Sequence, residues 1–159
     1  MIIDFHVHLM SPKLLAQGYW DNWVRLSSVL SGRPEEKIKE RLPEFWDDTG
    51  EMLISDMDSA GIDYSVTSVI DYGLAKGGGE ATHDILEINR LYSAIAQKYP
   101  DRLIAFASVD ARRDNAMAIL KTGINEFGMK GIKLLPPTGF YPDDQSCYPI
   151  YEFACDNGL

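Results

Sequence analysis

The sequence predicts an α/β fold in which a parallel sheet is covered by helices. Short runs of apolar and β-branched residues alternate with longer segments whose apolar residues recur at helical spacing. Parallel strands need a crossover connection between them, usually a helix, and this alternation supplies one each time. We therefore expect four consecutive strand–helix units along the 159 residues.

The expected strands are short and apolar. The first lies within residues 3–10 (IDFHVHLM). The later strands are expected at 62–70 (IDYSVTSVI), 103–110 (LIAFASVD) and 131–137 (GIKLLPP), the last being stopped by its prolines. Such nearly continuous apolar runs are typical of strands in a parallel sheet with both faces covered.

The expected helices occupy the intervals between these strands. Each one places apolar residues on a single face: Leu53, Met57 and Ala60 in 51–61; Ile85, Ile88, Leu91, Ile95 and Tyr99 in 82–100; Ile119, Leu120, Ile124 and Phe127 after the third strand. A last helix is expected over 148–158, where Pro149 suits the first turn and Gly158 suits the C-terminal cap.

We expect a single domain over residues 1–159, with a helical insert at about 11–48 in the first unit. The insert contains all three tryptophans and a charged stretch, RPEEKIKERLPEFW. It is either a helical excursion with a solvated face or a cover over the strand ends, where parallel sheets place their ligand sites. One excursion can do both.

Charge and composition argue against several classes of partner. The net charge of −9 repels phosphate backbones and anionic membranes, so we expect no nucleic-acid or membrane binding. No apolar run approaches the roughly 18 residues of a membrane span. The two cysteines, Cys147 and Cys155, are separated by about 12 Å of helix rise, too far for a disulfide. A reducing, cytoplasmic location is therefore expected.

Two histidines on the first strand are the strongest candidates for chemistry. Strict alternation would place Asp4, His6 and His8 on one face, with Phe5 and the other apolar residues under the covering helices. Neutral imidazole is the commonest metal ligand, and two on one strand can bind the same ion. We expect Asp4 to orient an imidazole or to lie in a polar floor beneath it. The alternative is a pair of histidines hydrogen-bonded within a polar interior.

Other polar residues follow the later strands. Asp71 and Tyr72 are expected at the mouth, within reach of a substrate. Asp110 is a candidate site carboxylate, with a helix cap or an exposed ion pair to Arg112 or Arg113 as the favoured alternative. A solvated or capping role is favoured for the third histidine of the chain. The Gly-rich stretch KGGGE (76–80) lacks the Lys-Ser/Thr ending of a phosphate-binding loop, which favours a flexible loop.

Four stretches, IDFHVHL, MDSAGIDYSV, KYPDRLIAFASVD and GMKGIKLLPPTGFYPDD, together resemble the amidohydrolase-related family of metal-dependent hydrolases and decarboxylases. Aminocarboxymuconate-semialdehyde decarboxylase is one of its members, and the resemblance is weakest at 11–48. It implies a (β/α)8 TIM barrel with a divalent metal, usually zinc, bound in part by His6 and His8. It also implies hydrolysis of a C–N or C–O bond, or nonoxidative decarboxylation, of a small carboxylic or cyclic substrate.

The resemblance further implies residues that these four units lack. A third histidine ligand, an aspartate ligand and the catalytic residues are expected beyond residue 159. We therefore expect a longer chain, a homo-oligomer or completion by a partner chain. Lys133 is expected to face inward, near the metal or the substrate; some distant barrel hydrolases carboxylate a lysine there, and pairing with a carboxylate is the alternative. The other functions considered are a non-catalytic half-barrel assembly module and a phosphoesterase-type barrel, whose usual Ser-Asp-Gly-like turn is absent here.

Overall fold

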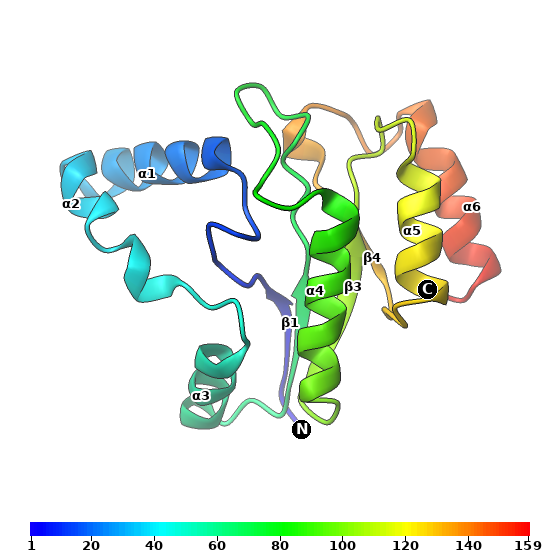
Figure 1. Ribbon diagram of the computed structural model, residues 1–159, viewed down its shortest axis with the longest axis horizontal. Helices are drawn as coiled ribbons and strands as arrows, with labels where there is room; N and C mark the ends of the chain where they lie inside the picture. Colours follow the sequence, from blue (N-terminus) through cyan, green and yellow to red (C-terminus); the bar gives the residue numbers. More distant parts are fainter.

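A computed structural model describes all residues 1–159 and contains one four-stranded sheet with the strand order β1-β2-β3-β4. Every neighbouring pair is parallel. The strands are β1 (Ile3–Val7), β2 (Tyr64–Ser68), β3 (Leu103–Ser108) and β4 (Ile132–Lys133) (Figure 1). The predicted α/β fold with four strand–helix units is confirmed, and the sheet has the curl of half a barrel.

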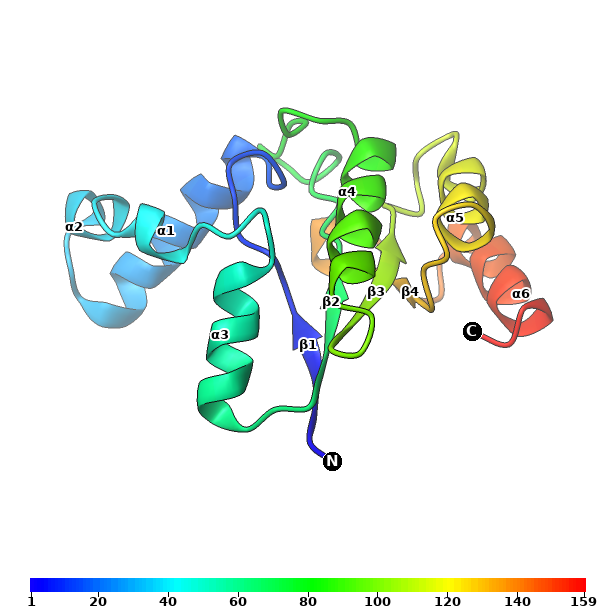
Figure 2. The same cartoon turned by 60° about the horizontal axis from the view of Figure 1, so that its bottom comes forward.

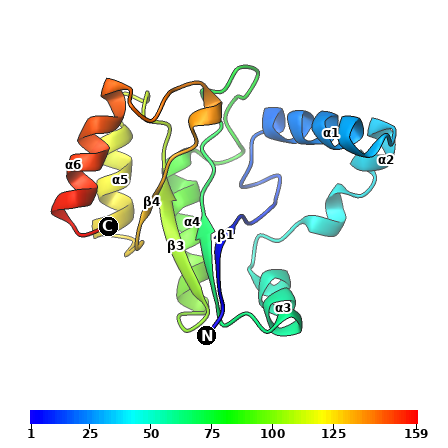
Figure 3. The same ribbon diagram turned by 180° about the vertical axis from the view of Figure 1, so that it is seen from behind.

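Helices cover one side of this sheet only. Figure 2 shows α3 (Glu51–Ala60), α4 (Ile85–Lys98), α5 (Ala116–Asn125) and α6 (Tyr148–Asp156) in an arc around the strands. Short 3-10 turns at Pro136–Thr138 and Gln145–Cys147 join β4 to α6. Seen from behind in Figure 3, the strands lie in front of α4 with no helix over them. One face of the sheet is therefore buried and the other is open.

The core lies between the sheet and its helices. Leu103, Ala105 and Ala107 alternate along β3 and are buried, whereas Ile104 and Phe106 between them are only partly buried. The close approach of α5 explains the small residue at Gly123, where a Cβ atom would lie 3.1 Å from Cβ of Ala107. The alternation on β3 therefore identifies the helix-covered and open faces of the whole sheet.

The insert forms an arm beside β1. It contains α1 (Gln17–Ser31), α2 (Glu35–Lys39) and a 3-10 turn at Leu42–Phe45. Figures 1 and 3 both show α1 and α2 extending away from the sheet at the level of the strand ends. Trp20 and Val24 are buried at the base of the arm, while Leu26, Val29 and Leu30 farther along α1 are exposed.

A β-bulge interrupts the alternation of β1. Asp4 pairs with Ser65 and Val7 pairs with Thr67, so three steps along β1 correspond to two steps along β2. The extra residue of a bulge changes which side chains share a face. Asp4 therefore lies on the same face as Val7, the side covered by helices.

This bulge corrects two expectations about the first strand. Asp4 does not share a face with His6 and His8. Phe5 does not lie under helices either: it is 67% exposed and packs edge-to-face on Phe106 of the open face, with ring centroids 5.6 Å apart. The burial predicted for Phe5 is wrong because strict alternation does not continue through the bulge.

The helices of the chain are all too short or too polar to cross a lipid bilayer.

Candidate metal centre

His6 and His8 converge at the carboxyl end of β1. Their Nε2 atoms lie 2.9 Å apart, and their rings are nearly perpendicular, with centroids separated by 4.9 Å. Two imidazole nitrogens at this separation can both lie about 2.0–2.1 Å from one ion, as zinc ligands do. The pair thus has the spacing of two ligands of a common metal.

Hydrogen bonding determines the tautomer of His8. Its Nδ1 lies 2.7 Å from the carbonyl oxygen of Ser68, an atom that can only accept, so Nδ1 carries the proton of the neutral ring. Burial lowers the pKa of His8; the Ser68 carbonyl opposes this, and the charges of His6 and Lys133 add to the lowering. His8 is therefore neutral at pH 7, with the lone pair of Nε2 directed toward His6.

Lys133 is the third group at this position. Its Nζ lies 3.4 Å from Nε2 of His6 across the open face of the sheet. Lys133 pairs with Ser108 of β3, and both follow the open-face alternation of that strand. Of the predicted site residues, the structure thus brings together His6, His8 and Lys133.

Asp4 lies apart from these three residues. Its Oδ1 accepts a hydrogen bond of 3.1 Å from the backbone N–H of His6, so the carboxylate stabilises the bulge and does not contact an imidazole ring. No cluster of three or more histidine, cysteine, aspartate or glutamate side chains in this chain is arranged to hold a metal ion. Catalytic zinc usually has three protein ligands, so His6 and His8 fit a divalent metal as part of its ligand set.

Asp71 belongs to a network at the rim of the sheet. Its carboxylate accepts hydrogen bonds from Arg113 Nε at 2.6 Å and from the backbone N–H of Asp110 at 2.7 Å. Arg113 also contacts Glu80, and Asp71 further accepts the N–H of Gly73. These contacts tie the loop after β2 to the loop after β3. The structure places Asp71 with Arg113 rather than beside the histidines.

A second group of contacts at this end of the sheet is centred on Asp110. This residue is 1% exposed and pairs with Arg112, whose guanidinium also donates to the carbonyl oxygens of Leu74, Thr138 and Gly139. Burial raises the pKa of Asp110, but the hydrogen bonds from Arg112 and Thr138 outweigh it, so the pKa lies below its ordinary value. The predicted exposed ion pair is therefore exposed on one side only, since the carboxylate of Asp110 is buried while the side chain of Arg112 is 32% exposed. The cap of α5 is Asn115 instead.

The arm reaches this rim through α1. Asn22 Nδ2 donates to the hydroxyl of Tyr72 at 2.9 Å, and Tyr19 packs edge-to-face on the same ring. A Cβ atom on Gly18 would collide with the carbonyl oxygens of Gly77 and Gly78. The Gly-rich stretch therefore lies in close backbone contact with α1.

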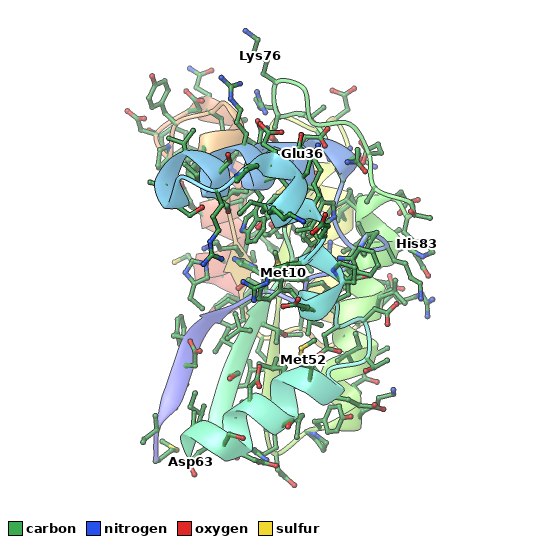
Figure 4. All side chains as sticks on the ribbon, turned by 90° about the vertical axis from the view of Figure 1, so that its left-hand side faces the viewer. Met10, Glu36, Met52, Asp63, Lys76 and His83 are labelled. Carbon is green, nitrogen blue, oxygen red and sulfur yellow. The ribbon has the colours of Figure 1, made fainter.

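Figure 4 labels two further polar residues of the chain, Lys76 and His83. Lys76 is at the tip of the loop after β2, and His83 points outward at the start of α4. The helix cap beside His83 is Asp84, which accepts the backbone N–H of Glu87. Arg112 and Arg113 connect the loops that follow β2, β3 and β4. This role was not predicted from the sequence, in which only their position close to Asp110 pointed to it.

The family model described as Amidohydrolase matches residues 3–159. No protein with a curated description matches the sequence significantly. Among solved structures, 5-carboxyvanillate decarboxylase from Novosphingobium aromaticivorans, complexed with manganese and 4-hydroxy-3-methoxy-5-nitrobenzoic acid, is 23% identical, with a TM-score of 0.68 over 100% of this chain and 48% of that one. An uncharacterised TIM-barrel protein from Bordetella bronchiseptica is 26% identical, with a TM-score of 0.64 over 99% and 53%.

A third structure, 2,6-dihydroxybenzoate decarboxylase from Rhizobium, is 19% identical, with a TM-score of 0.60 over 96% of this chain and 46% of that one. The chain thus spans about half the length of the solved barrels that it matches. Its four strands correspond to one half of such a barrel.

Proposed function

The chain belongs to the amidohydrolase family, and we propose that it supplies the first metal-binding strand of an enzyme acting on a small carboxylic or cyclic substrate. The proposed reaction is nonoxidative decarboxylation of an acid, or hydrolysis of a C–N or C–O bond. Bound at His6 and His8, a divalent metal supplies a Lewis acid that polarises the substrate or lowers the pKa of a bound water.

One observation carries this proposal: the Nε2 atoms of His6 and His8 are directed at each other at 2.9 Å. The Ser68 carbonyl holds the proton of His8 on Nδ1, which keeps Nε2 free to bind the ion. Both imidazoles stand at the carboxyl end of a parallel strand, where barrels of this type place their active sites.

We propose that Lys133 binds the substrate. Its ammonium lies at the mouth beside His6, where it can bind a carboxylate and hold that group next to the metal. The names of two structural relatives, 5-carboxyvanillate decarboxylase and 2,6-dihydroxybenzoate decarboxylase, are those of enzymes acting on aromatic acids. We therefore propose an aromatic or other small carboxylic acid as the first substrate class to test.

The proposed metal is zinc, since imidazole ligands suit it, and the manganese in one relative makes that ion the alternative. Further ligands come from a longer chain, a second copy or a partner chain. The net charge of −9 disfavours nucleic acid and anionic membranes as partners. The proposed location is the cytoplasm, where an exposed thiol such as that of Cys155 stays reduced.

The experiment is a metal-dependent activity assay. Purified protein is stripped with a chelator, reloaded with Zn²⁺ or Mn²⁺, and tested for CO2 release from hydroxybenzoates and for hydrolysis of lactones and amides. The expected result is turnover that requires the metal and is lost in the His6→Ala/His8→Ala variant. Protein that retains metal at these histidines without any turnover would instead support a non-catalytic assembly module. Turnover without metal would contradict the proposal.

A further inference from the structure

Ser108, the last residue of β3, carries a buried hydroxyl group without a hydrogen-bond partner. The residue has no exposed surface, and its Oγ makes no hydrogen bond. Its backbone N–H and carbonyl both bond to the side chain of Asn89, so the hydroxyl alone is unsatisfied. Because a buried polar group without a partner is destabilising, this hydroxyl points to a partner that reaches it in another state of the site.

The cross-strand neighbour of Ser108 is Lys133. The two residues are paired in the register of β3 and β4, so their side chains lie on the same face of the sheet. Neighbouring strands are about 4.8 Å apart, a distance that the four methylene groups of a lysine easily span. In the present structure the ammonium instead lies 3.4 Å from Nε2 of His6.

An aromatic ring occupies the face of the sheet on the other side of Lys133. Gly131 precedes Lys133 by two residues, and a Cβ atom on Gly131 would lie 2.5 Å from the ring of Phe106. The ring therefore covers this part of β4. Toward the start of its own strand, the ammonium of Lys133 would meet an apolar surface and no acceptor.

The carboxylate nearest to Ser108 along the chain is already used. Asp110 accepts hydrogen bonds from the guanidinium of Arg112 and from the hydroxyl of Thr138, and its side chain has no exposed surface. It has no room for a further cation. Besides His6, the hydroxyl of Ser108 is therefore the acceptor that the register places beside Lys133.

We infer that Ser108 is a positioning residue for Lys133, whose ammonium donates to Ser108 Oγ when His6 and His8 bind a divalent metal. This inference rests on the proposed metal-binding function. An ammonium is repelled by a divalent cation at the same imidazole, whereas a serine hydroxyl accepts a hydrogen bond from it. Lys133 thus leaves the ligand free and stays at the mouth, where it can bind a carboxylate.

The test measures zinc affinity by competition with a chromogenic chelator. Ser108→Ala removes the acceptor, so Lys133 stays at His6 and zinc affinity should fall about tenfold. The fold should persist, as checked by circular dichroism, because the removed oxygen has no partner. Ser65→Ala is the matched control: Ser65 is as fully buried and its hydroxyl is also unpartnered, but it pairs with Leu103 of the helix-covered face. This control should leave the affinity unchanged.

The effect should depend on the ammonium. Lys133→Met/Ser108→Ala should bind zinc as tightly as Lys133→Met, because no ammonium is left to be positioned. In the unaltered protein, lysine side-chain NMR should show slower exchange of the Lys133 ammonium protons once zinc binds, as expected on transfer to a buried acceptor.

Several outcomes would overturn the inference and leave the proposed function standing. These are unchanged zinc affinity in Ser108→Ala, an equal loss with and without Lys133, an equal loss in Ser65→Ala, or ammonium exchange that zinc does not alter. Unaltered protein that binds no divalent metal at His6 and His8 would overturn both the inference and the proposed function.

Discussion

Lys133 and His6 meet at 3.4 Å, although their strands form opposite edges of the sheet. The contact places an ammonium group beside the nitrogen that is proposed to bind the metal. An ammonium and a divalent cation repel each other, so Lys133 and the metal compete for the space near His6 unless an anionic substrate lies between them.

Removing this charge should strengthen metal binding. Lys133→Met keeps the length of the side chain, and we expect zinc affinity in the absence of substrate to rise about tenfold. Competition with a chromogenic chelator measures it. Lys130→Met, the same change at an exposed position just before β4, should leave the affinity unchanged. A fall in affinity in Lys133→Met would show that the side chain supports the ligands instead of competing with the ion.

The two histidines should account for the metal that the protein retains. His6→Ala/His8→Ala should abolish the zinc or manganese that remains after dialysis, as measured by elemental analysis. The fold should persist because both side chains lie on the open face of the sheet. His83→Ala is the matched control, since this histidine lies at the start of α4 and should not affect metal content. Equal metal in the double variant and the control would exclude the assignment.

Asn89 should be among the most sensitive positions for stability. It is fully buried, and its side chain donates to the carbonyl oxygens of Ile85 and Ser108 and accepts the N–H of Ser108. Asn89→Ala leaves buried groups at the end of β3 unpaired, so the free energy of unfolding should fall by about 1–3 kcal/mol. Urea denaturation measures this, with the exposed Asn125→Ala as control. Equal midpoints for both variants would contradict the expected role.

Asp110 should make the fold sensitive to acid. Its pKa is lower in the folded than in the unfolded chain, so the unfolded chain takes up a proton first as the pH falls. The stabilisation is fully present above the ordinary aspartate pKa of about 4 and is lost as the pH falls through the lower, folded value. Urea denaturation between neutral and acid pH should therefore show a smaller loss of stability in Asp110→Asn. The control, Asp114→Asn, changes an exposed residue and should follow the unaltered protein.

Gly18→Ala should reverse the usual effect of such a change. Alanine in place of glycine within a helix ordinarily stabilises it by about 1 kcal/mol. Here the added methyl group collides with the carbonyl oxygens of Gly77 and Gly78, so α1 must separate from that loop. Hydrogen exchange should become faster in both segments, whereas Arg25→Ala on the exposed side of α1 should not accelerate it in the loop. Slower exchange in both segments would contradict the prediction, because it would show that α1 and the loop accommodate the methyl group without separating.

The order and type of the elements follow from periodicity alone. The spacing of Ile85, Ile88 and Ile95 specifies the buried face of α4, and Asp84 ends up as the helix cap. Strand β4 covers only Ile132–Lys133 of the expected 131–137, and a 3-10 turn begins at Pro136. Local patterns thus predict the type of these elements, but not the exact end of β4.

Fewer features of the candidate site could be predicted from the sequence pattern. A bulge adds one residue without changing the apolar pattern, so the orientations of Asp4 and Phe5 did not follow from alternation. The pairing of Asp71 with Arg113 joins residues 42 positions apart in loops, and no periodicity encodes it. His6 and His8 could be predicted from the sequence because they are two residues apart at the carboxyl end of one short strand.

The strand order also bears on how the chain is made. Each strand pairs with the one synthesised just before it, so a strand leaving the ribosome finds its neighbour already formed. Pairing between successive strands keeps loop-closure costs modest and lets the sheet grow in one direction during translation. The open face of β1 stays uncovered throughout this growth, with Phe5 and Ile3 exposed. Nascent chains on the same messenger RNA therefore expose apolar side chains to one another before any of them is released.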